Sequence, residues 1–86
     1  MPYINQTERS MLDPRKLEGI TFPTKAGELQ FVIACYIERF IKHGNGLSYQ
    51  TINDIVGALE GAKLEFYRRV AAPYENDKCE ENGDVY

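Results

Sequence analysis

Hydrophobic residues in the middle of the chain recur with the spacing of a helix. From Leu29 to Ile41, apolar side chains fall at i, i+3, i+4, i+7 and i+8, which is the pattern of one helix face. This stripe predicts an amphipathic helix over about 26–43, with Thr24 as a candidate N-cap. We expect Gly44 to supply the left-handed residue that commonly follows a helix end.

A second apolar stripe runs from Ile52 to Val70 with the same period. It predicts a longer helix over about 49–72, capped by Ser48 and ended by Pro73, because proline cannot continue the helical hydrogen-bond ladder. Only four or five residues connect the two stripes, so we expect the two helices to fold back as an antiparallel hairpin.

The ends of the chain differ from this helical body. Asp13-Pro14 is typical of an N-cap followed by proline at the first helical position, and it predicts a short helix over about 14–18. Residues 75–86 show no apolar period. We therefore expect an all-α fold with a single helical domain over 1–74 and a disordered or loosely packed acidic tail over 75–86.

Charge is distributed unevenly over the 86 residues. The chain has 10 Lys+Arg and 13 Asp+Glu, a net charge of −3, of which the segment from Tyr74 onward carries −4. A nearly neutral body with an acidic tail disfavours binding to duplex DNA, which depends on summed phosphate neutralisation. A single basic pocket for a small anion remains compatible with it.

Several classes of protein are disfavoured by what the sequence lacks. We see no apolar run long enough to span a membrane and no secretory signal. The two cysteines, Cys35 and Cys79, do not make a disulfide framework or a zinc site, and we expect Cys35 to act as a small core residue. These features favour a reducing, cytoplasmic location.

A hairpin and a short third helix cannot enclose a core unaided. Chains with fewer than about 70–80 ordered residues usually need a metal, disulfides or association, and association is the route left here. We therefore expect a homo-oligomer. Gly57 and Gly61 place small side chains one helical turn apart, which admits close approach either of the other helix of the same chain or of a second copy.

Residues suited to catalysis are sparse. His43 is the single histidine, and at the end of a helix it is expected to interact with the terminal carbonyls. No phosphate-binding glycine loop, metalloprotease motif or serine elbow occurs. The sequence thus indicates a protein that is not an enzyme and that needs no metal or cofactor.

The end of the long helix carries the residues best suited to a ligand. Tyr67, Arg68 and Arg69 lie there, and arginine forks bind phosphate while tyrosine offers a stacking face. A helix C-terminus does not itself attract anions, so a phosphate site would need a second element such as Lys25. The alternative is that Glu65 pairs with Arg69 and that Arg68 meets the acidic tail.

Two resemblances extend this interpretation. The segments Met1–Ile4 and Phe66–Tyr86, which read MPYI and FYRRV-x-APYE…ENGDVY, resemble small proteins of bacteriophages and their hosts. The pattern of a helix, a short polar loop and a long helix ending Arg-x-Val-Ala-x-Pro is similar to the phage anti-CBASS sponge proteins. Here that motif is formed by Arg68, Val70, Ala71 and Pro73.

The sponge resemblance implies a small helical homo-oligomer, often a hexamer, that sequesters a cyclic oligonucleotide immune signal without turnover. Only Arg68 is placed by the motif; Tyr3, Lys25, Tyr67 and Arg69 are candidate ligand-binding residues by residue type. The alternative is an oligomeric helical adaptor that binds and blocks a host protein, with Tyr67, Tyr74, Tyr86 and the acidic tail as its contact patch.

Overall fold

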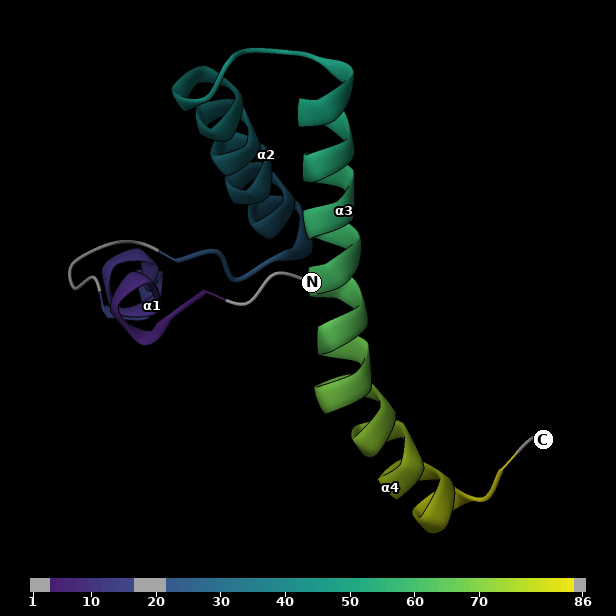
Figure 1. Ribbon diagram of the computed structural model, residues 1–86. Helices are drawn as coiled ribbons and strands as arrows, with labels where there is room; N and C mark the ends of the chain where they lie inside the picture. Colours follow the sequence, from purple (N-terminus) through teal and green to yellow (C-terminus); the bar gives the residue numbers. More distant parts are fainter. Residues whose placement is uncertain (1–3, 17–21, 85–86) are drawn as a thin grey trace. The chain divides into compact units, whose positions relative to one another are not determined.

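The computed structural model describes residues 4–16 and 22–84 (Figure 1). The chain divides into two compact units, Met1–Gly46 and Leu47–Tyr86. The described residues lie in helices and their connections, with no strand among them. The predicted all-α class is confirmed.

The first unit begins with a helix that the apolar pattern did not reveal. Helix α1 (Gln6–Leu12) is capped by Asn5, whose side chain accepts a hydrogen bond from the Glu8 N–H at 2.8 Å. Its seven residues are too few to show a period. A 3₁₀ turn, η1 (Pro14–Lys16), follows, so the helical turn predicted over 14–18 is found for its first three residues, and the other two lie outside the described part.

Helix α2 (Ala26–His43) has the bounds that the stripe predicted. Its N-cap is Lys25 instead of Thr24, so the predicted cap is one residue out. The reason is that Glu28 reaches back to the preceding turn: its carboxylate accepts hydrogen bonds from the Thr24 N–H at 2.9 Å and from Thr24 Oγ1 at 3.3 Å. These bonds lower the pKa of Glu28.

The connection after α2 differs from the expectation for Gly44. The Gly44 N–H still donates to the Phe40 carbonyl at 3.2 Å, so this residue closes the helix with a φ of −95°. The left-handed residue is Gly46, with a φ of +82°. In the second unit, Ser48 caps α3 (Tyr49–Phe66) as predicted, accepting from the Thr51 N–H at 3.1 Å.

The prediction that Pro73 ends the second long helix is wrong. After α3 the chain forms a π-helical turn, η2 (Tyr67–Ala71), and continues as α4 (Ala72–Asn82) until Gly83, whose φ is +87°. Figure 1 shows one bent but continuous helix from green to yellow. The acidic segment predicted to be loose is therefore helical as far as Asn82.

The π turn provides the physical reason for this continuity. Proline lacks an N–H, and in a regular α-helix its ring would clash with the carbonyl four residues earlier, here that of Arg69. In the structure the Ala72 N–H instead donates to the Tyr67 carbonyl five residues back, which widens the helix just before the proline. The helix therefore continues through Pro73.

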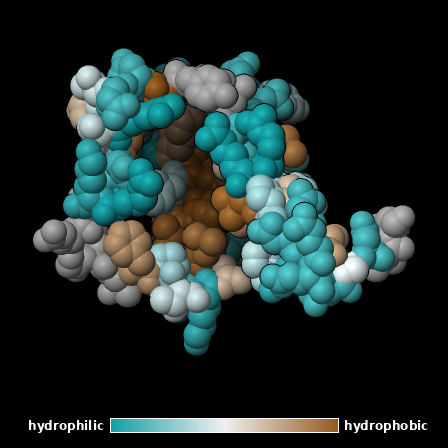
Figure 2. Space-filling view, turned by 90° about the horizontal axis from the view of Figure 1, so that it is seen from below, coloured by the Kyte–Doolittle hydropathy of each residue, from teal (hydrophilic) through white to brown (hydrophobic). Residues whose placement is uncertain are grey.

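None of the described side chains is buried, and large apolar residues lie at the surface, where Figure 2 shows brown apolar atoms among teal polar ones. The two long helices both contribute to this exposed set. On α2, Phe31 is 61% and Tyr36 63% exposed, and on α3, Val56 is 60% and Phe66 61% exposed. Cys35, expected as a core residue, is exposed as well. Within the described residues, no helix is both long and apolar enough to cross a bilayer.

Two glycines make a matched pair for testing the backbone assignment. Gly46 has a positive φ, so Gly46→Ala is expected to lower the free energy of unfolding by about 1 kcal/mol or more. Gly57 lies inside α3, and a Cβ there meets nothing within 4 Å, so Gly57→Ala is expected to raise it by about 0.5–1 kcal/mol. Urea denaturation followed by circular dichroism measures both, and shifts of the same sign would contradict the assignment.

Asp13 gives a prediction for pH dependence. The Arg15 side chain and then the Arg15 backbone N–H, both donating at 2.8–2.9 Å, lower the pKa of Asp13 from 3.8 to about 2. Because the folded value lies below the unfolded one, this interaction stabilises the turn above about pH 4 and is lost as the pH falls toward 2. A carboxyl NMR titration of Asp13 should show a midpoint near 2 that moves toward 3.8 in Arg15→Ala and stays in place in the control Arg9→Ala.

Candidate functional site

Three of the five predicted ligand-binding residues share one turn. Tyr67, Arg68 and Arg69 are the first three residues of η2, where the helix is widened ahead of Pro73. All three are exposed: Tyr67 is 52% exposed, and the side chains of Arg68 and Arg69 are 68% and 70% exposed. Single π turns inside α-helices are frequent at functional sites.

Glu65 holds both arginines of this turn. Its Oε1 lies 2.7 Å from Arg68 Nη2, and its Oε2 lies 2.8 Å from Arg69 Nε. The predicted Glu65–Arg69 pair is thus confirmed, whereas Arg68 pairs with Glu65 as well and does not meet the acidic segment. The three side chains, two guanidinium groups and one carboxylate, together carry a net charge of +1.

Glu65, Arg68 and Arg69 differ in their exposure to solvent, and this difference indicates what the three side chains can bind. The Glu65 side chain is only 26% exposed, far less than either arginine. The carboxylate therefore lies beneath the guanidinium groups, whose outer edges remain open to solvent. Arg69 contacts Glu65 through its Nε, and its side chain remains 70% exposed, so the guanidinium group is accessible to a phosphate oxygen.

One tyrosine links the turn to α4, and a second makes a contact within α4. Tyr67 Oη donates to Glu75 Oε2 at 3.2 Å, and Lys78 Nζ lies 5.6 Å from the centre of the Tyr74 ring. Lys78 also pairs with Glu81 at 3.2 Å. The acidic segment thus holds Tyr67 instead of the arginine that we expected it to meet.

The other two predicted residues belong to other parts of the chain. Lys25 is the N-cap of α2 and belongs to the first unit. Tyr3 lies outside the described residues.

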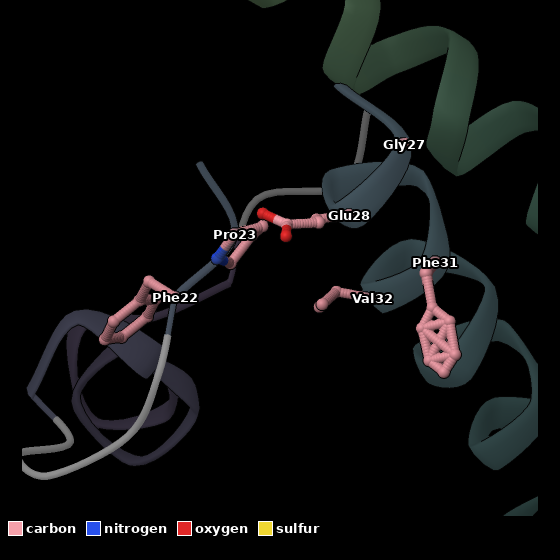
Figure 3. Close-up of a pocket in the computed structure, with 6 residues that line it drawn as sticks. All are labelled: Phe22, Pro23, Gly27, Glu28, Phe31 and Val32. Carbon is pink, nitrogen blue, oxygen red and sulfur yellow. The ribbon is translucent and has the colours of Figure 1, made fainter. Parts of the chain in front are cut away.

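The first unit has a shallow hollow of about 390 Å³ at the start of α2. Figure 3 shows Phe22 and Pro23 on one side of it and Phe31 and Val32, from α2, on the other, with the Glu28 carboxylate near Pro23. Its lining is mainly apolar, and its charged group is an acid already bonded to Thr24. This hollow does not suit a phosphate.

The remaining candidates for chemistry are dispersed. His43 is the last residue of α2, where a positive charge is favourable. Cys35 and Cys79 are both free thiols at the surface. No group of His, Cys, Asp and Glu suited to a metal ion occurs among residues 4–16 and 22–84.

Sequence reasoning located the cluster but missed two of its parts. The i+3 and i+4 spacing from Glu65 to Arg68 and Arg69 could have shown that one carboxylate reaches both arginines. The bond between Tyr67 and Glu75 spans eight residues and depends on the helix continuing past Pro73. No local pattern indicated that continuation.

Comparison with known proteins gives a family and no activity. No curated protein and no solved structure matches the chain. A family model described as Domain of unknown function (DUF6899) matches residues 1–85. Because this match covers all but the final residue, the chain belongs to the DUF6899 family.

Proposed function

We propose that the protein is a homo-oligomeric helical binder that sequesters a cyclic nucleotide or a related signalling nucleotide without turnover. The observation that carries this proposal is the π turn, on which Tyr67, Arg68 and Arg69 are exposed together above Glu65. Guanidinium forks match phosphate oxygens, and the tyrosine ring offers a face on which a base can stack.

The exposed apolar stripes of α2 and α3 support the oligomeric part of the proposal. Each stripe is a full helix face, and none of the described side chains in either unit is buried. We propose that the two helices, which have 18 residues each, pair as an antiparallel hairpin and that a second copy covers the apolar surface left over. Such an assembly can bring Lys25 from one copy to the arginines of another.

The test is calorimetry with a panel of cyclic di- and trinucleotides. Arg68→Ala removes a charged, fork-shaped phosphate donor and is expected to weaken binding tenfold or more, which corresponds to about 1.5–3 kcal/mol. Arg68→Lys should lose part of this affinity, because it keeps the charge and loses the fork. Arg39→Ala removes an exposed arginine on α2 and should leave the affinity unchanged.

Two results would overturn the proposal. One is the absence of heat and of a thermal shift with every nucleotide at high micromolar concentration. The other is recovery of a chemically altered nucleotide after the complex is denatured, since sequestration leaves the ligand intact.

A second candidate function is a helical adaptor that binds and blocks a host protein. It is favoured by the exposed Tyr67 and Tyr74 next to the acidic residues of α4, since tyrosine and arginine dominate interface hot spots.

The adaptor function predicts a stoichiometric complex with one host protein in a lysate, without a response to any nucleotide. Tyr74→Ala should abolish this complex, and Tyr49→Ala, which alters a tyrosine 89% exposed at the start of α3, should leave it intact. Equal capture by both variants would contradict this function.

A further inference from the structure

The continuous helix of the second unit is much longer than the other helices of the chain. Helix α3 (18 residues), η2 (five) and α4 (11) together span about 50 Å, whereas the 18 residues of α2 span about 27 Å. Helix α2 is little more than half as long as this helix and is too short to cover all of it. Helix α1, with seven residues, adds about 10 Å.

The apolar stripe of α3 continues across the π turn into α4. Its first positions, Ile52, Ile55, Leu59, Ala62 and Phe66, alternate in steps of three and four, as in a coiled-coil seam. Val70 and Tyr74 follow at two successive steps of four.

The widened turn corrects the phase of these last two positions. In a regular α-helix, each step of four residues rotates a side chain about 40° off the stripe. A π turn holds more residues per turn, so η2 offsets this drift. Phe66, Val70 and Tyr74 therefore stay on one face, and they are 61%, 53% and 63% exposed.

Charge reverses sign along this same stretch. Residues 63–69 contain three basic side chains and one acid and carry a net charge of +2: Lys63, Arg68, Arg69 and Glu65. Residues 75–84 carry five acids and one lysine, a net charge of −4. Between Val70 and Tyr74 come the short side chains of Ala71, Ala72 and Pro73, which allow another helix to approach closely.

We propose that residues 63–84 dock on the same residues of a second copy. The two helices are antiparallel and cross between Val70 and Tyr74. Val70 of each copy then packs against the partner's Tyr74. The basic turn of each copy faces the acidic α4 of the other, so the dimer contains this contact twice. A parallel pair would place like charges opposite one another, so charge selects the antiparallel direction.

The docking places the two arginines of the turn differently. Arg69 and Asp77 flank the stripe on the same side, so in a two-fold antiparallel pair Arg69 meets the partner's Asp77. Arg68 is two residues before Val70, about half a turn around the helix, and stays outside the interface. The proposal goes beyond the nucleotide function and does not depend on a ligand.

The first experiment is sedimentation velocity of the full chain over a concentration series without nucleotide. Tyr74→Lys should weaken self-association at least tenfold. The control, Tyr49→Lys, alters a tyrosine that is 89% exposed and lies away from the crossing, and it should not change self-association. Circular dichroism must show unchanged helix content in both. Equal self-association of Tyr74→Lys and the unaltered chain would overturn the proposal.

A charge exchange tests the direction of pairing. Arg69→Glu and Asp77→Arg should each weaken the dimer, and the double variant should recover most of the lost affinity, because the pair is restored with its signs exchanged. A double variant as weak as the single ones would overturn the antiparallel assignment. Since these measurements contain no nucleotide, an intact dimer that fails to bind any nucleotide would count against the proposed function alone.

Discussion

Pro73 imposes the constraint on which the second unit depends. A residue without an N–H lies in the interior of a long helix, and the chain accommodates it by widening the preceding turn to a five-residue hydrogen-bond spacing. That widening keeps α3 and α4 in one continuous helix. It also places Tyr67 within reach of Glu75.

Glu65 then determines the electrostatics of the turn. Both of its carboxylate oxygens contact guanidinium groups at less than 3 Å. The Glu65 side chain is shielded from solvent, whereas the two arginine side chains are exposed. A carboxylate in this position fixes the directions of two flexible side chains and cancels one of their charges. Exposed ion pairs of this kind add little to stability, so their main effect is on orientation and on the charge that an anion meets.

In the first unit, local polar hydrogen bonds determine the conformation of the connections. Its connections are held by short-range polar bonds: Asn5 caps α1, Asp13 holds Arg15, and Glu28 reaches back to Thr24. These bonds define local turns without burying apolar surface. The exposed faces of α2 and α3 consequently need contacts beyond their own helices, which is why association enters every functional proposal for this chain.

The sequence by itself determined the elements whose signals are local. The periodic stripe fixed α2 from Ala26 to His43, Ser48 fixed the start of α3, and the spacing of residue types located the Tyr67–Arg69 cluster. These outcomes follow because helix periodicity, capping and i+4 pairing involve residues within one turn of each other.

Only the three-dimensional structure decided what happens where two local rules compete. At Pro73 the helix-breaking rule favoured a stop, yet a change of hydrogen-bond spacing by one residue removes the clash and keeps the helix. At the loop, both Gly44 and Gly46 could adopt a positive φ; Gly44 closes the helix with a φ of −95°, and Gly46 takes the positive value. In each case the residue types permit more than one backbone conformation, and they do not specify which one the chain adopts.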